Sequence, residues 1–120
     1  MFAPTDEAFT RLFDTLDSDP STETLKDILL LHVIAEQVLD KDDLKDQCWD
    51  QTTMANGDET RTICANDKQD IFQRGDGNSW DGIPEITAFD IHACNGIVHV
   101  VDEVLLPEVP DTCKSIGKLL

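Results

Sequence analysis

The residues best suited to covalent chemistry in this 120-residue chain are its four cysteines, Cys48, Cys64, Cys94 and Cys113. They form an even set without a Cys-x-x-Cys pair, which in a small acidic domain predicts two disulfides and an oxidising compartment. The alternative is a zinc site that recruits His92, although structural zinc sites usually pair their ligands at short spacing. We therefore expect neither a metal ion nor a cofactor.

Four cysteines allow three pairings, and the turn signals favour one of them. An Asn-Gly turn at residues 56–57 lies midway between Cys48 and Cys64, so a hairpin around it would bring these two sulfurs to bridging distance. The second bridge would join Cys94 to Cys113 and tie the C-terminal tail back along the strand that follows Cys94. If the tail crosses to another sheet instead, Cys113 would meet Cys48 or Cys64.

Arg74, Gly75 and Asp76 place opposite charges side by side and are followed by Gly77. Because glycine adopts positive φ without strain, we expect this segment to be an exposed turn. A carboxylate presented in this way can complete the coordination of a partner's metal ion while the guanidinium pairs with acidic groups. The tripeptide is therefore a candidate binding site, with an ordinary hairpin turn as the alternative, because tripeptides recur by chance.

His32 and His99 both lie among apolar residues, which predicts buried imidazoles with a structural role rather than catalytic groups. The sequence has no motif of a serine hydrolase, a zinc protease or a phosphate-binding loop, so we assign no catalytic residue. Acidic pairs are plentiful, but residues 40–43 lack the spacing and the glycine of a calcium-binding EF-hand loop.

The charge of the chain limits its partners. Nine Lys and Arg residues against 25 Asp and Glu residues give a formal net charge of −16. Because phosphate binding needs a basic face, this charge excludes nucleic acid, disfavours an anionic membrane surface, and favours cations or basic patches on a partner. No apolar run reaches the roughly 18 residues that a membrane-spanning helix requires, and residues 1–7 show no secretory signal, as expected for a mature fragment of a secreted protein.

The first third of the chain shows the periodicity of helices. Thr5 is a good N-cap, and apolar residues at i, i+3, i+4 and i+7 follow it from Phe9 to Leu16. A second amphipathic helix is predicted to begin near Thr22 and to present one apolar face as far as Val33. Residues 40–44 predict only a short helical turn, because they carry too few apolar side chains for an independent helix.

From Gln47 onward the chain has the pattern of short strands rich in Thr, Ile, Val and Trp, separated by turn signals. The clearest strand spans residues 96–106, where both faces are largely apolar, and this pattern predicts a central place in a sheet. Helices followed by antiparallel strands predict an α+β fold, with one domain at residues 1–108 and a tail at residues 109–120.

Three ordered segments resemble the signature motifs of the fasciclin domain family. They are residues 2–9 (FAPTDEAF), residues 29–34 (LLLHVI), which are similar to the family's central Tyr-His segment, and residues 95–107 (NGIVHVVDEVLLP). The resemblance implies a wedge-shaped β-sandwich that carries a helical layer. Two features depart from the family pattern: the elements that usually precede the first motif are missing, and Leu31 stands where the family has tyrosine.

The resemblance also implies a non-catalytic role in cell adhesion or matrix interaction, in a secreted or cell-surface protein. The expected partners are cell-surface or matrix proteins or glycans, and tandem fasciclin copies are expected in the parent protein. Asp90 and Ile91 resemble a pair found at the equivalent place in integrin-binding fasciclin domains, whereas strand alternation alone predicts an exposed Asp beside a buried Ile. The alternative function is that of an acidic matrix protein which associates with cations or mineral and has no specific protein receptor.

Overall fold

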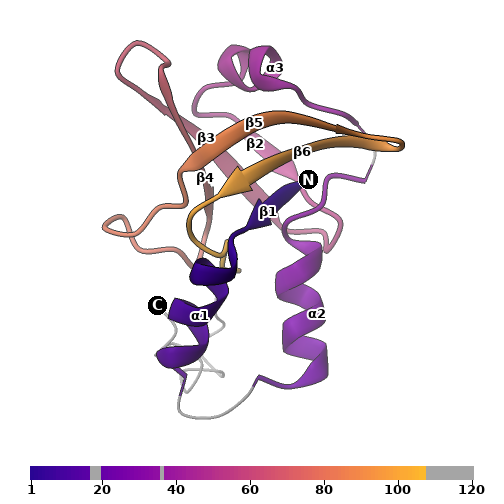
Figure 1. The fold of residues 1–120 in the computed structure, drawn as a ribbon, viewed down its shortest axis with the longest axis vertical. Coiled ribbons are helices and arrows are strands. Elements are labelled where there is room, and N and C mark those ends of the chain that lie inside the picture. Colours follow the sequence, from indigo (N-terminus) through magenta and orange to yellow (C-terminus); the bar gives the residue numbers. More distant parts are fainter. Residues whose placement is uncertain (17–19, 36, 108–120) are drawn as a thin grey trace.

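The computed structural model describes residues 1–16, 20–35 and 37–107, and its helices and strands are drawn in Figure 1. The α+β architecture that the sequence predicted is confirmed. The elements in chain order are β1 (Phe2–Pro4), α1 (Asp6–Asp14), α2 (Thr22–Leu30), α3 (Lys41–Asp46), β2 (Gln51–Thr53), β3 (Glu59–Ala65), β4 (Asp70–Gly75), β5 (Ile86–Ala93) and β6 (Gly96–Val101).

The strands of the described ranges form two three-stranded sheets. In the first sheet β6 lies between β1 and β5, and β1 runs parallel to β6 with Phe2 opposite His99. The second sheet has the order β2-β3-β4 with antiparallel neighbours. The central place that the sequence predicted for the strand beginning at Gly96 is therefore confirmed.

β6 is shorter than predicted, because it ends at Val101 rather than at Leu106. The N–H of Asp102 donates to the carbonyl oxygen of Glu85, and the Asp102 carboxylate accepts the Glu85 N–H at 2.8 Å, so the ladder with β5 stops here. Residues 104–106 are nevertheless buried, and Leu105 and Leu106 donate their N–H groups to side chains. Residues 104–106 are apolar because they are still buried, although they lie beyond the end of β6.

The helices begin at capping residues that the sequence supplies. The side chain of Thr5 accepts the N–H of Ala8 at the start of α1, and Ser21 accepts the N–H of Thr24 at the start of α2, both at 3.1 Å. The short α3, predicted only as a turn, begins with a capping box between Asp40 and Asp43. None of the helices in the described ranges has the length and apolar character needed to cross a membrane.

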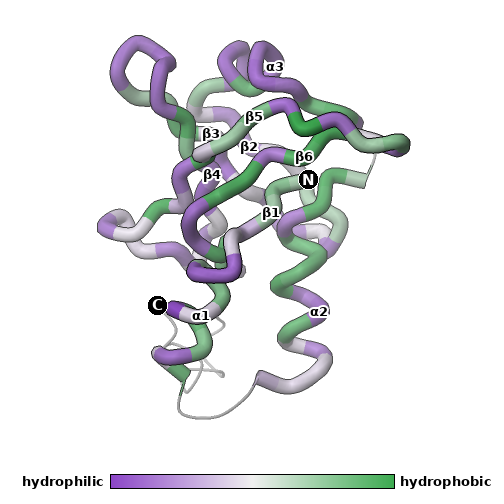
Figure 2. Tube along the Cα trace, in the orientation of Figure 1, coloured by the Kyte–Doolittle hydropathy of each residue, from purple (hydrophilic) through white to green (hydrophobic). Residues whose placement is uncertain are grey.

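Two hydrophobic clusters hold these elements together. The larger one joins side chains from both sheets, including Phe2, Ile71 and Val101, and therefore lies between the sheets. The smaller one joins α1 and α2, which extend from the same end of the sheets in Figure 1, through residues that come from three separate segments: Ala8, Leu12, Ile28, Val104 and Leu106. Figure 2 shows the corresponding hydrophobic stretches along α2 and β6.

Candidate functional site

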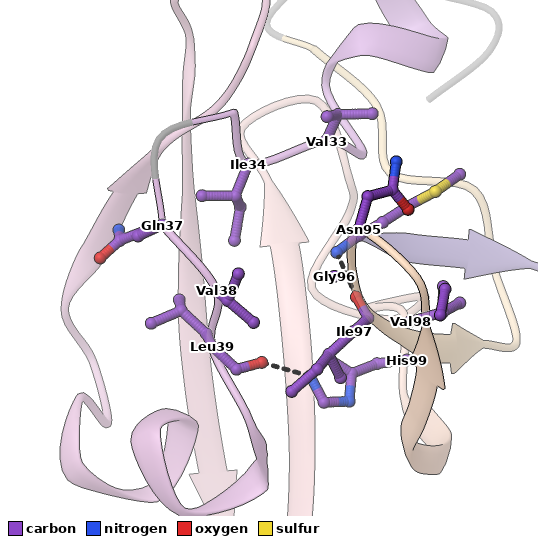
Figure 3. A pocket seen from close by; sticks show the side chains of 12 residues that line it. Val33, Ile34, Gln37, Val38, Leu39, Asn95, Gly96, Ile97, Val98 and His99 are labelled. Carbon is purple, nitrogen blue, oxygen red and sulfur yellow. Dashed lines mark hydrogen bonds between the residues drawn. The ribbon is translucent and has the colours of Figure 1, made fainter.

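A groove, which we call the hairpin groove, lies between the segment that follows α2 and the β5–β6 hairpin (Figure 3). Its volume is about 190 Å³, and no Asp, Glu, Lys or Arg side chain lines it, although such residues make up 28% of the chain. Val38, on its rim, is 56% exposed. The apolar lining comes mainly from Val33, Ile34, Val38, Leu39, Ile97 and Val98.

His99 joins the two sides of the hairpin groove. Its Nε2 donates to the carbonyl oxygen of Leu39 at 2.7 Å, and its Nδ1 accepts the N–H of Asp90 at 3.2 Å. A ring that accepts at one nitrogen and donates at the other is neutral. Burial favours this neutral form, because it lowers the pKa of His99 below that of a free imidazole. The predicted burial of His99 is confirmed, and its bonds connect backbone segments.

Asp90 bonds to the first turn of α3. It has a φ of 57°, in the left-handed region, and its Oδ1 accepts the N–H of Lys41 at 2.8 Å. The ammonium group of Lys41 in turn lies 4.6 Å from the ring centroid of Phe89. The carboxylate of Asp90 therefore already satisfies a free N–H at a helix start, where negative charge is favourable.

Ile91 does not have the burial that strand alternation predicted. Its side chain is 46% exposed. The register of β5 against β6 shifts twice, between Ile86 and Ala88 and between Ala88 and Ile91, so the strict alternation of inward and outward side chains is lost. The carboxylate of Asp90 is thus engaged within the chain, whereas Ile91 is exposed.

His32 lies just after α2 and is 1% exposed, as predicted. Its carbonyl oxygen accepts the N–H of Phe2 at 2.8 Å, which positions the start of β1. Its ring contacts the backbone at Leu105. The histidine thus connects the helical layer with both ends of the described chain.

The segment 74–77 differs from the exposed turn that the sequence predicted. Arg74 and Gly75 are the last residues of β4, Gly75 is buried, and the side chain of Arg74 is only 16% exposed. Only Asp76 among the three is exposed, at 48% of its side chain. The guanidinium of Arg74 lies 4.3 Å from the ring centroid of Trp80, and its Nη1 is 3.9 Å from Oδ1 of Asp76.

Gly75 and Gly77 are required by close backbone contacts, not by positive φ. A Cβ atom on Gly75 would lie 2.3 Å from the carbonyl oxygen of Leu106, and one on Gly77 would lie 2.1 Å from that of Pro107. Real Cβ contacts are essentially never this short, so any side chain would displace the buried segment that follows β6. These two glycines are therefore explained by packing.

The predicted bridge between Cys48 and Cys64 is confirmed, with Cα atoms 5.6 Å apart. It continues the register of β2 and β3, in which Gln51 is opposite Arg61. Cys94 is exposed and has no disulfide partner among the residues that the structure describes, and Cys113 lies outside those residues, so their pairing stays a prediction. In the same ranges no group of three or more His, Cys, Asp or Glu side chains is placed to hold a metal ion.

Comparison with known proteins decides the family. The model of the fasciclin domain matches residues 1–107. The chain belongs to the fasciclin domain family. A search of curated proteins gave no match.

The fold of this fasciclin domain is similar to that of a solved FAS1 domain pair from the insect cell adhesion molecule fasciclin I. The TM-score is 0.68 at 21% sequence identity, and the match covers 99% of this chain and 39% of that chain. The described chain therefore spans well under half of the matched structure, and at this identity the likeness shows the fold.

Sequence reasoning did not single out Trp80, the most exposed large apolar side chain of the fasciclin domain at 61%. Its indole stacks with Arg74, which gives the exposed ring a fixed support. The available signal was a tryptophan among turn-forming residues, Asn78, Ser79 and Gly82, where an apolar side chain has no core to enter.

A buried polar chain inside the second sheet was also not predicted. Gln73 is 0% exposed, its Oε1 accepts the hydroxyl of Thr62, and its Nε2 donates to the hydroxyl of Thr60, both at 2.8 Å. Gln47 extends the chain by donating to Thr52 at 2.9 Å and to Thr62 at 3.0 Å. Polar residues at 60 and 62 signal a solvent-facing side of a strand, but here that side faces inward.

Proposed function

We propose that this fasciclin domain is an extracellular adhesion or matrix-interaction module that binds other macromolecules and catalyses no reaction. The observation that carries the proposal is the family match over residues 1–107. The insect cell adhesion molecule fasciclin I, which contains a domain pair of this fold, supports the same use and a tandem arrangement in the parent protein.

The disulfide supports a secreted or cell-surface setting. Cys48 and Cys64 are bonded, and disulfides persist mainly where the environment is oxidising. The net charge of −16 keeps copies of the chain apart and attracts basic surfaces over the range of the Debye length.

The binding surface of the proposal is formed by Arg74, Asp76 and Trp80, which we call the Trp80 platform. Trp80 exposes 61% of its surface while the guanidinium of Arg74 supports its ring at 4.3 Å. Tryptophan and arginine are enriched among the residues that dominate binding energy at protein interfaces. A ring already held in place loses little conformational freedom on binding.

The chemistry of the Trp80 platform favours a partner with a basic patch beside an apolar contact. The guanidinium of Arg74 already contacts the Trp80 indole and Asp76. The groups that remain for a partner are the exposed part of the indole and the Asp76 carboxylate. Opposite charge speeds association and fixes orientation. We therefore name basic regions of cell-surface or matrix proteins as the partner class, with Ile91 as a second exposed apolar contact.

Attachment of cells to surfaces coated with the purified full chain tests the proposal. Trp80→Ala should weaken attachment by at least about tenfold, as expected for an interface tryptophan, and Asp76→Asn should weaken it several-fold. Trp49→Ala is the matched control, because Trp49 is also a tryptophan exposed to 52% but lies outside the platform, and it should attach like the wild type.

Three results would overturn parts of the proposal. If the wild-type chain does not support attachment, the adhesive function is wrong. If all variants attach equally, the function stands and the Trp80 platform is wrong. If attachment requires millimolar calcium and is insensitive to every substitution, the domain acts as an acidic, cation-associated matrix protein instead.

A further inference from the structure

We propose that the free edge of β2 binds an extended segment of a partner protein, which adds to the second sheet as a further strand and carries lysine or arginine on both sides of an uncharged centre. This surface is separate from the Trp80 platform. The inference therefore goes beyond the proposed function and names a second place of contact, where main-chain hydrogen bonds supply the affinity.

The hydrogen bonds of β2 leave one of its edges unpaired. β2 lies at the edge of the sheet, because the strand order is β2-β3-β4. The N–H of Met54 donates to the carbonyl oxygen of Asp58 at 2.9 Å or less, and the N–H of Thr62 donates to that of Asp50 at 3.1 Å. In an antiparallel pair the hydrogen-bonded positions alternate, so the residues between these positions direct their main-chain groups away from β3.

The main-chain groups directed away from β3 are those of Gln51 and Thr53. Within the described ranges neither residue forms a main-chain hydrogen bond on this outer edge, and both side chains are exposed. Ala55, the next residue with the same orientation, donates its N–H to the carbonyl oxygen of Val33 at 2.7 Å. The segment after α2 thus pairs with the outer edge at Ala55 only, and the edge is open at Thr53 and Gln51.

A groove lies along this open edge, and we call it the β2 groove. Ile34, Ala35 and Gln37 form one side and residues 51–55 form the other, and the volume is about 570 Å³. This volume falls within the roughly 300–1,000 Å³ of sites that hold drug-sized ligands, so a short stretch of extended chain fits. None of these lining residues carries a charged side chain, which favours an uncharged centre in the bound segment.

The charges on either side of β2 favour a basic partner. Residues 46–59 contain no lysine or arginine and four exposed acidic residues, which are Asp46, Asp50, Asp58 and Glu59. The guanidinium of Arg61 in β3 is already engaged with the carbonyl oxygen of Trp49. A second copy of this chain would bring the same acidic residues together, whereas lysine or arginine at the ends of a partner segment is attracted to them.

The first experiment uses the full chain and a synthetic probe, the acetylated and amidated peptide KKTVTVTKK, which has basic ends and a centre of β-branched residues. Amide hydrogen exchange is measured by NMR at about 0.15 M salt, where distant charges are screened. In the free chain the amides of Gln51 and Thr53 should exchange rapidly. Saturating peptide should slow both by at least about fivefold and leave the exchange of Thr52, which pairs with β3, unchanged.

Two controls separate strand addition from attraction by charge alone. The first is the same peptide with N-methyl groups on two adjacent central residues, which removes one N–H from each edge and keeps the charge. It should bind at least about tenfold more weakly. The second is Thr53→Pro, which removes the outer donor at a position where an edge strand tolerates proline. This variant should lose binding of the unmodified peptide to a similar extent while its unfolding midpoint stays that of the wild type.

A matched pair of charge variants tests the basic ends of the partner. Asp50→Asn should weaken binding of the probe several-fold, whereas Asp67→Asn, which removes the same charge from the β3–β4 turn, should leave it unchanged. Equal binding of the two peptides would show that charge alone holds the probe. Slow exchange of Gln51 and Thr53 in the free chain would show that the edge is already paired. Either result, or an absence of binding, overturns the proposal and leaves the attachment test of the Trp80 platform unaffected.

Discussion

The backbone N–H of Leu105 donates to Nε2 of His32, which lies 2.9 Å away and 73 residues earlier in the chain. Nδ1 of the same ring bonds to the carbonyl oxygen of Ile28 at 2.7 Å, so both nitrogens are satisfied only when the imidazole is neutral. Burial lowers the pKa of His32 to about 4, against a smaller opposing effect of the Ile28 carbonyl. The bond between α2 and the segment after β6 thus depends on the charge of His32.

The lowered pKa of His32 predicts that the domain loses stability on acidification. The pKa is about 4 in the folded state and 6.5 in an unperturbed histidine, so between these values the unfolded chain binds more protons. The contribution of His32 is therefore complete above about pH 6.5 and is lost toward pH 4, by up to about 3 kcal/mol in the free energy of unfolding. Urea unfolding at several pH values measures this loss.

His32→Ala separates this effect from the general protonation of carboxylates. At pH 7 the substitution should cost about 1–3 kcal/mol, because packing and a buried hydrogen-bond acceptor are lost. The difference between wild type and variant should shrink as the pH approaches 4. A difference that stays constant with pH would contradict the charge-dependent bond, and coincident unfolding curves at pH 7 would contradict the burial of His32.

Asp90 is expected to act on stability rather than on recognition. Asp90→Ala removes the acceptor for the Lys41 N–H and places alanine at a φ of 57°, so it should cost about 1–2 kcal/mol. Asp90→Asn keeps an oxygen acceptor and tolerates the left-handed backbone, and should cost much less. Thermal melts and the cell-attachment assay are compared for both. A variant that melts like the wild type but no longer supports attachment would make Asp90 a recognition residue.

The bridge between Cys48 and Cys64 is expected to hold the β2–β3 hairpin against unfolding. It closes a loop with a sequence separation of 16, for which the chain-entropy model gives about 3 kcal/mol. The double variant Cys48→Ser with Cys64→Ser should lose most of this amount in urea unfolding. An unchanged unfolding midpoint would mean that the denatured chain is already restricted in this region.

The main lines of the fold could be predicted from local signals. Thr5 and the apolar periodicity that follows it determine α1, and the Asn-Gly turn at 56–57 places Cys48 opposite Cys64. The end of β6 could not be predicted, because Asp102 stops the ladder through bonds to Glu85, and the apolar pattern does not change there. Burial and strand pairing are separate properties, and sequence periodicity reports only the first.

The candidate sites were harder to predict, because their properties depend on contacts distant in sequence. The exposure of Ile91 follows from two shifts of register in β5, and the N–H that Asp90 caps lies 49 residues away. The burial of Gly75 depends on a segment near Leu106. Trp80 could have been noticed as an isolated aromatic among turn residues, but its support by Arg74 could not.

The buried chain of Gln73, Thr60 and Thr62 is expected to behave as one unit. Thr62→Val leaves Oε1 of Gln73 without its donor inside the sheet and should cost about 1–3 kcal/mol. Gln73→Leu alone leaves the threonine hydroxyls with fewer partners. The double variant should lose less stability than the sum of the single variants, because the unpaired amide oxygen of Gln73 is removed. Chemical denaturation of the four proteins of this cycle measures the coupling, and additive losses would contradict it.

Gly75→Ala and Gly77→Ala are expected to destabilise the domain by more than about 2 kcal/mol each, because the new Cβ atoms would lie 2.3 Å and 2.1 Å from the carbonyl oxygens of Leu106 and Pro107. Gly82→Ala is the matched control, since its nearest neighbour would be Ser79 Oγ at 3.5 Å, and it should change stability by less than about 0.5 kcal/mol. Denaturant unfolding followed by tryptophan fluorescence gives all three values. A stable Gly75→Ala variant would mean that the segment after β6 can move away from β4 at little cost. If Gly75→Ala is destabilised, a loss of attachment in that variant reports unfolding. Asp76→Asn is then the substitution that tests recognition in this segment.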